Sequence, residues 1–137
     1  MPVREFKELR VYKQAYDAAT EIFEASKDWP KEETYALTDQ IRRSSRSVCA
    51  NIAEAWRKRR YKKHFVSKLS DADAEAAETR TWLQFGHDSG YLTGNEFERL
   101  DATYNQICGG LVNMMKDPAP WCGPGTSHEP SIPYDAP

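Results

Sequence analysis

Apolar residues recur every third or fourth position along most of this chain, in four successive runs. This spacing places them on one face of an α-helix, which has about 3.6 residues per turn. The chain offers no candidate strands. The expected helices cover about residues 7–28, 35–57, 61–88 and 94–116. Four amphipathic helices joined by short loops predict an all-α fold, an antiparallel up-and-down four-helix bundle.

The same periodicity predicts which side chains form the core. In the first helix the expected buried stripe is Leu9, Tyr12, Tyr16, Ala19 and Phe23. The other three stripes are Leu37, Ile41, Ser44 or Ser45, Val48, Ile52 and Ala55, then Phe65, Leu69, Ala72, Ala76, Thr79 and Leu83, then Phe97, Leu100, Tyr104, Ile107, Leu111 and Met114 or Met115. The second stripe is rich in small side chains, which predicts close helix packing.

Local signals predict where the helices begin and end. Pro30 ends the first helix, because proline cannot continue the backbone hydrogen-bond ladder. Thr34 is the expected cap of the second helix. No glycine or proline separates the second helix from the third, so the turn is placed within the basic residues 57–61. Thr93 and Glu96 have the spacing of a capping box at the start of the fourth.

A chain of 137 residues forms one domain, here residues 1–116. Six of the last 21 residues are proline, and no periodicity remains, so residues 117–137 are expected to form a partly disordered C-terminal tail. Docking of this tail on the bundle or on a partner through Trp121 and Tyr134 is the alternative. No apolar run has the length of a membrane span or the character of a secretory signal, which predicts a cytoplasmic protein.

The charges are segregated along the chain, although they nearly cancel to a net charge of -2. Residues 42–68 contain ten Lys or Arg against one acidic residue. Such a segment either meets a polyanion or pairs with acidic residues of this chain or of a neighbouring subunit. The candidate nucleic-acid contacts are Arg42, Arg43, Arg46, Arg57, Lys58, Arg59, Arg60, Lys62 and Lys63. Trp56 and Tyr61 flank the densest part and are candidates for stacking on unpaired bases.

The sequence contains no pattern typical of catalysis or of a cofactor. No Glu-x-x-His pair of the kind that binds metals in helical bundles occurs, and no glycine-rich phosphate loop. Asp71, Glu75 and Glu78 share one helix face, where salt bridges explain them better than acid–base chemistry does. We therefore expect no enzyme, no metal and no cofactor. Asn51 and Glu54 lie beside an apolar stripe, which indicates a structural hydrogen-bonding role.

Several short motifs resemble a known family. Residues 37–43 (Leu-Thr-Asp-Gln-Ile-Arg-Arg), Ser47-Val48 and residues 51–54 (Asn-Ile-Ala-Glu), preceded by Trp29-Pro30 and a glutamate, are similar to the four-helix-bundle family of the 23S rRNA intervening-sequence proteins. The resemblance runs over about residues 3–116. More loosely, the chain resembles the accessory variability protein of diversity-generating retroelements. Where the family usually has glycine after Asn-Ile-Ala-Glu, this chain has Ala55.

The resemblance implies a bundle that assembles into a homopentameric ring and whose role is ill-defined. By analogy with the accessory protein, a basic pentamer that binds nucleic acid, the basic residues at 42–46 and 57–63 would face RNA or DNA. The leading hypothesis is therefore a non-enzymatic protein that binds nucleic-acid backbone through the second helix and the turn after it. The alternative is an interaction scaffold whose basic segment contacts acidic protein surfaces.

Overall fold

The computed structural model describes residues 3–123, which form helices and their connections. Four helices are long: α1 (Arg10–Ser26), α2 (Leu37–Arg57), α3 (Lys62–Asp88) and α4 (Gly94–Lys116). Three are short: η1 (Phe6–Glu8), η2 (Lys31–Glu33) and α5 (Ala119–Cys122). No strand occurs within residues 3–123, so the predicted all-α class is confirmed. Within that range, no helix has the length and apolar character needed to cross a membrane.

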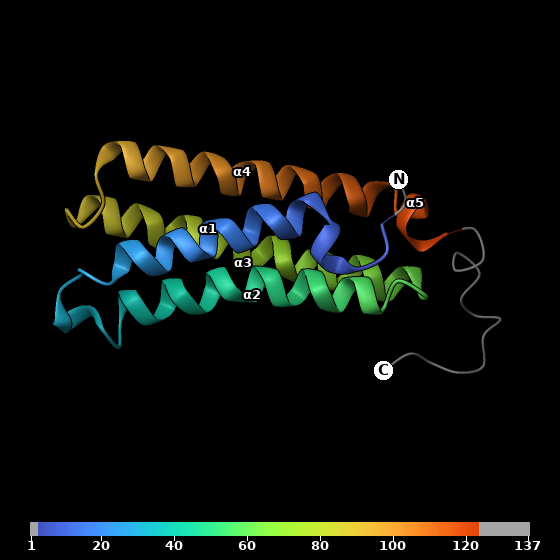
Figure 1. Cartoon of the computed structure of the whole chain (residues 1–137), viewed down its shortest axis with the longest axis horizontal. Helices are drawn as coiled ribbons and strands as arrows, with labels where there is room; N and C mark the ends of the chain where they lie inside the picture. Colours follow the sequence, from blue (N-terminus) through green and yellow to red (C-terminus); the bar gives the residue numbers. More distant parts are fainter. Residues whose placement is uncertain (1–2, 124–137) are drawn as a thin grey trace.

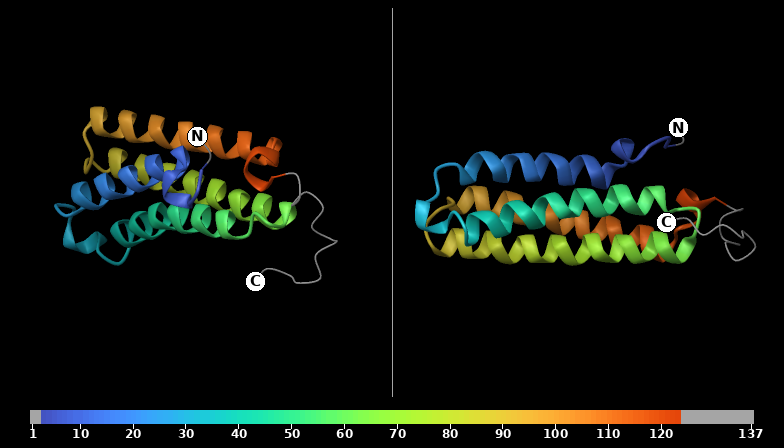
Figure 2. Two further views of the ribbon diagram at one scale, coloured as in Figure 1. Left: turned by 45° about the vertical axis from the view of Figure 1, so that its right-hand side comes forward. Right: turned by 90° about the horizontal axis from the view of Figure 1, so that it is seen from below.

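The long helices run alternately up and down as a four-helix bundle (Figure 1). α2 packs against α3, α3 against α4, and α1 against both α2 and α4. The N-terminal segment, the α2–α3 turn and α5 lie together at one end (Figures 1 and 2), called here the turn end (residues 3–10, 57–63 and 113–123). The α1–α2 and α3–α4 connections lie at the opposite end, called the loop end (residues 24–39 and 84–99).

The first helix is shorter than the predicted span of 7–28. Residues 6–8 form η1 instead, and Leu9 has an extended backbone with ψ 135°, so α1 begins only at Arg10. The helix ends at Ser26, whose carbonyl accepts a hydrogen bond from the Trp29 N–H (3.2 Å) in the turn before Pro30. A short helical turn thus replaces the first predicted turn of α1.

The second helix begins at Leu37 rather than 35, and the predicted cap at Thr34 is wrong. Thr34 closes η2, because its N–H donates to the carbonyl of Lys31 (3.0 Å). The Glu33 carboxylate takes over the capping role and accepts a hydrogen bond from the Leu37 N–H (3.3 Å). The longer glutamate side chain reaches the start of the helix from one residue earlier.

The remaining boundaries agree with the sequence. The α2–α3 turn lies at residues 58–61, and the N–H of Lys58 donates to Glu54 (3.0 Å) as α2 ends. α3 is followed by Gly90, which has φ +83° and so takes the conformation that glycine adopts most readily. At the start of α4, Thr93 and Glu96 form both hydrogen bonds of the capping box.

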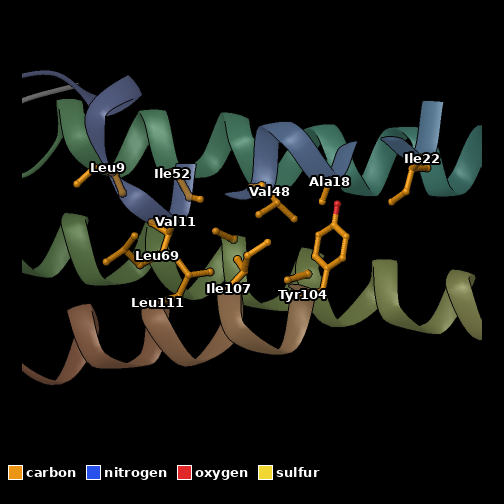
Figure 3. Packing of buried hydrophobic residues seen from close by; sticks show 14 of the residues in the cluster. Leu9, Val11, Ala18, Ile22, Val48, Ile52, Leu69, Tyr104, Ile107 and Leu111 are labelled. Carbon is orange, nitrogen blue, oxygen red and sulfur yellow. The ribbon is translucent and has the colours of Figure 1, made fainter. Parts of the chain in front are cut away.

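Three of the four predicted core stripes are confirmed apart from the half-buried Phe97, while in the first stripe only Leu9 is buried. The buried residues of α1 are Val11, Ala15, Ala18, Ile22 and Ser26, and the first four each lie one position before a predicted residue. Val11, Ala18 and Ile22 point toward the residues of the other helices in Figure 3. One residue is a rotation of about 100° around the helix. The large aromatic residues of α1 therefore lie beside the core rather than in it.

The rotation of α1 follows from how close it lies to α4. A Cβ atom added at Gly110 of α4 would lie 2.7 Å from Cγ1 of Val11. Small or β-branched residues on α1 permit this approach, while the rings of Tyr12 and Tyr16 would not fit between the backbones. Hydrophobic character alone does not distinguish these two faces of α1, because both are apolar.

The C-terminal segment after α4 begins with a short helix. Residues 119–122 form α5, in which Trp121 packs against the core and Cys122 is buried. The packing of Trp121 agrees with one part of the alternative expectation, while the partly disordered tail over residues 117–137 stays a prediction. Residues 124–137, including Tyr134, lie outside the described part of the chain.

The core also contains polar groups, and Tyr104 carries one of those that lack a hydrogen-bond partner within residues 3–123. Ser44 of α2 and Thr79 of α3 form a hydrogen bond of 2.8 Å at full burial. The hydroxyl of Tyr104, which points between α1 and α2 near Ala18 and Val48 (Figure 3), has no hydrogen-bond partner within residues 3–123. A buried polar group without a partner costs about 1–3 kcal/mol.

Replacing Tyr104 by phenylalanine is therefore expected to raise the free energy of unfolding by about 1–2 kcal/mol, because it removes the unpaired hydroxyl and keeps the ring. The measurement is the midpoint of urea denaturation followed by circular dichroism. Tyr16→Phe is the control, since the Tyr16 side chain is 56% exposed and its substitution should change stability by under about 0.5 kcal/mol. A lower midpoint for the Tyr104 variant would contradict the expectation.

Candidate nucleic-acid interface

Six of the nine predicted contact residues lie in the α2–α3 turn and the helix ends that adjoin it, within residues 57–63, and are called here the cations of the turn. α2 ends at Arg57 and α3 begins at Lys62, so the intervening residues reverse the direction of the chain at the turn end (Figure 1). The side chains of Arg57, Arg60, Lys62 and Lys63 are exposed, while those of Lys58 and Arg59 are half-buried. No carboxylate of residues 3–123 forms an ion pair with Arg57, Lys58, Arg59 or Lys63.

Arg59 holds the turn in place. Its guanidinium lies 3.8 Å from the centre of the Trp56 ring, and its Nη1 donates to the Trp56 carbonyl (2.8 Å). Burial, with the neighbouring charge of Arg57 as a second cause, lowers the pKa of Arg59. A guanidinium stays charged under such shifts. Arg59 is therefore a positive charge fixed on a buried ring, with part of its donor capacity already used.

The aromatic residues of the turn are not available for stacking on bases, so that prediction is wrong. Trp56 and Tyr61 are each only 4% exposed. Trp56 belongs to the hydrophobic core, and Arg59 covers its ring. A turn without glycine or proline is held by apolar side chains that anchor it to the end of the core, and these two residues are placed to do so. The turn presents charge to solvent, without an aromatic platform.

The three remaining predicted contacts lie apart from the turn, on α2. Arg46 precedes Arg57 by eleven residues, which places it about 16 Å along the helix axis. Arg42 is already engaged: its Nε donates to Ser26 Oγ (2.8 Å) and its Nη2 to the carbonyl of Phe23 (3.4 Å). It thus ties the C-terminal end of α1 to α2. The nine residues therefore form two groups rather than one continuous surface.

Arg43 and Arg46 are the exposed members of the second group. The guanidinium of Arg46 lies 5.4 Å from the centre of the Phe23 ring. Arg43 faces α3, where its charge acts to lower the pKa of Glu75. Burial and the neighbouring acidic residues raise that pKa and are the larger effects. Both residues also line a shallow hollow of about 590 Å³ beside Tyr35, which is 92% exposed.

Asn51 and Glu54 form contacts within the bundle. The Asn51 amide donates to the carbonyl of Ser47, one turn earlier on α2 (2.9 Å). The Glu54 carboxylate lies 3.1 Å from Nζ of Lys68, which also lies 3.3 Å from Asp71. These hydrogen bonds raise the pKa of Lys68, with Glu54 the larger cause. Glu54 therefore connects α2 to α3 at the protein surface.

The two ends of the bundle carry opposite charge. The turn end contains ten Lys or Arg residues against three acidic ones, since Arg4, Lys7, Arg10 and Lys116 join the six of the turn. The loop end contains eight acidic residues against three basic ones. The four additional cations lie far from the turn in sequence, so only the up-and-down topology brings them together. From the sequence, these four residues could have been found by combining the predicted helix order with their positions near helix ends.

Burial and local contacts limit the reactivity of the cysteine thiols and of the carboxyl groups on α3. Burial raises the pKa of Cys49 and of Cys108 to about 11, so both thiols are protonated at neutral pH. The carboxylate of Glu78 accepts a hydrogen bond from Trp82 Nε1 (3.2 Å). Burial and the neighbouring Glu78 and Asp71 raise the pKa of Glu75. Residues 3–123 contain no cluster of His, Cys, Asp and Glu arranged to hold a metal ion.

Comparison with known proteins agrees with the fold and with the motifs of α2. The family model of the 23S rRNA-intervening sequence proteins matches residues 7–113, which include all four long helices up to the last turn of α4. The chain belongs to this family. No curated protein matches the sequence.

A solved structure shares the fold. It is the crystal structure of a protein of unknown function from the S23 ribosomal protein family of Bacteroides thetaiotaomicron, with a TM-score of 0.70 and 29% sequence identity. The match covers 77% of this chain and 95% of that one. The family and the fold are thereby settled, while both descriptions leave the role of such proteins open.

Proposed function

We propose that this protein is a non-enzymatic nucleic-acid-binding bundle that contacts the phosphate backbone through its turn end. The observation that carries the proposal is the gathering of six Lys or Arg within residues 57–63 at one end of the bundle. Like charges at this spacing repel each other, and a polyanion relieves that repulsion. Double-stranded DNA supplies about one phosphate for every 1.7 Å of its axis.

The mode of contact follows from what the turn exposes. Trp56 and Tyr61 are buried, so the turn offers lysine and arginine side chains without rings for base stacking. Phosphate contacts fix a protein on the backbone and carry little sequence information. We therefore propose binding of RNA or DNA with low sequence selectivity, in which Arg43 and Arg46 supply secondary contacts.

The proposal includes assembly of the bundle into a homopentamer, as the resemblance to the family implies. The side chain of Phe85 on α3 is 55% exposed, which gives such an assembly apolar surface to bury. In a ring with parallel bundles, all turn ends would lie on one rim. Several weak basic sites on one rim would then act together on a long polyanion, since linked sites gain from high effective concentration.

The test is titration of nuclease-treated protein with fluorescently labelled single- and double-stranded RNA and DNA at 50 and 200 mM salt. Four to six phosphate contacts predict that duplex affinity falls by roughly 10² to 10³ between these concentrations. Light scattering coupled to size exclusion is expected to give five times the chain mass of 15.7 kDa. Affinity that does not change with salt, or no binding to any of the four nucleic acids, would contradict the proposal.

The opposite charge of the loop end favours a second candidate, an interaction scaffold. Its eight acidic residues offer a protein surface complementary to the basic turn end. In this alternative the turn end contacts the acidic surface of another subunit or of a partner protein. A charge-reversing variant of the turn distinguishes the two: the scaffold predicts loss of assembly from a protein that never binds nucleic acid.

A further inference from the structure

An apolar groove runs along the outside of the bundle between α1 and α2. It has a volume of about 510 Å³. One wall comes from α1, with η1 at its end, and is aromatic; the other comes from α2 and is made of small side chains. The lining residues are Phe6, Tyr12, Tyr16, Ala19, Thr20 and Phe23 on the first wall, and Arg46, Cys49, Ala50 and Ala53 on the second.

The aromatic wall is a consequence of the rotation of α1. The rings of Tyr12 and Tyr16 stack with their centres 6.1 Å apart, and Phe6 meets Tyr12 edge-on at 5.1 Å. Tyr16 is nevertheless 56% exposed. The rings of Phe6, Tyr12 and Phe23 are half-buried and still line the groove. Apolar surface of this kind that is open to solvent marks a binding surface.

Basic side chains flank the groove. Arg46 belongs to its α2 wall, and Lys7 and Lys13 line the hollow on the other side of Tyr12 and Tyr16, together with Asp17. The stacked rings of Tyr12 and Tyr16, called here the tyrosine ridge, thus have positive charge on both sides. An occupant that combines apolar or proline residues with acidic ones complements it.

The chain contains a segment of this character directly after the described residues. Residues 124–137 include prolines at 124, 130, 133 and 137, with Ile132 and Tyr134 as the large apolar side chains. The segment carries Glu129 and Asp135 and no lysine or arginine. Pro130 and Pro133 have the Pro-x-x-Pro spacing, and prolines pre-set the extended polyproline conformation that aromatic-lined grooves recognise.

We propose that residues 130–137 dock in the α1–α2 groove of the same chain, with Pro130, Pro133 and Ile132 against the tyrosine ridge. The proposal does not depend on nucleic-acid binding. The described chain ends at Gly123 at the turn end, where η1 and Phe6 also lie (Figure 1). Residues 124–130 span about 22 Å at 3.1 Å per residue. The bundle end is about two helix diameters wide, or about 20 Å, so this length reaches the groove.

A native thiol in the groove wall makes the proposal testable in the full-length chain. The experiment replaces Ile132 by cysteine and oxidises the protein with copper phenanthroline, followed by peptide mapping by mass spectrometry. Docking predicts a disulfide between Cys49 and the new cysteine, in at least tenfold higher yield than for Thr126→Cys. A cysteine at position 126 is expected to cross-link poorly, because three residues after Gly123 span at most about 11 Å, while Cys49 lies about 12 Å along α2 from Arg57 at the turn end.

Two further variants test the specificity of the contact. Cys49→Ser must remove the cross-link, and the double variant Tyr12→Ser/Tyr16→Ser is expected to reduce its yield at least fivefold while the helical circular dichroism stays unchanged. Equal yields for the variants at positions 132 and 126 would overturn the proposal. Cross-links to Cys108 or Cys122 in place of Cys49 would also overturn it. The same holds if, in a mixture of isotopically labelled and unlabelled protein, cross-links form only between different chains. Dissociation of an oligomer by the tyrosine variant without any cross-link would assign the groove to a second copy.

Discussion

Removing four positive charges from the α2–α3 turn is expected to weaken nucleic-acid binding by at least about a hundredfold at 50 mM salt. The variant replaces the four exposed cations of the turn by glutamine: Arg57, Arg60, Lys62 and Lys63. Arg59 is retained, because its stacking on Trp56 holds the turn. Each lost phosphate contact should also reduce the dependence of log K on log salt by about 0.9, so the salt slope falls by between three and four.

The matched control removes four positive charges elsewhere in the chain, so its net charge equals that of the turn variant. It replaces Lys13, Lys27, Lys31 and Arg99 by glutamine, all of them outside the turn end and none of them a proposed nucleic-acid contact. If the turn end is the interface, this control should lose under about tenfold in affinity. Equal losses in the two variants, measured by fluorescence anisotropy with the same duplex, would mean that net charge rather than the turn end attracts the nucleic acid.

The fold was predictable from sequence to the extent that one face of a helix differs chemically from the others. α2, α3 and α4 each have one dominant apolar stripe, and the residues predicted for these stripes are buried apart from the half-buried Phe97. α1 has two adjacent apolar faces, one aromatic and one built from Val11, Ala15, Ala18 and Ile22. The choice between them depends on the distance to α4, which only the assembled bundle defines.

The candidate interface was predictable as a cluster in sequence, but not as an arrangement in space. In the sequence, the basic residues within 57–63 form one run, and in the structure they lie together at the turn end. The arginines of α2 belong to the same basic segment of the sequence, yet the rise of the helix separates them from the turn. Arg42 in addition binds the end of α1. Trp56 and Tyr61 were assigned to solvent because they flank the charges. Their burial depends on the core behind the turn, a tertiary property that local composition does not encode.

The close approach of α1 to α4 predicts opposite effects for one substitution at two adjacent positions. Gly109 and Gly110 both lie inside α4, where alanine favours the helix by about 0.5–1 kcal/mol over glycine. A Cβ at Gly109 meets nothing within 4 Å, so Gly109→Ala is expected to stabilise the protein by about that amount. A Cβ at Gly110 lies 2.7 Å from Val11 Cγ1, and Gly110→Ala is expected to destabilise it by about 1–3 kcal/mol.

The two variants should therefore differ in free energy of unfolding by about 2–4 kcal/mol, measured by urea denaturation. Val11 has little freedom to move aside, because it is 5% exposed and its β-branched side chain holds one rotamer in a helix. Adding Val11→Ala to Gly110→Ala removes the clashing methyl group and should recover part of the loss. Equal stability of the two glycine variants would mean that α1 does not pack on α4 at this distance, and the rotation that exposes the tyrosine ridge would lose its cause.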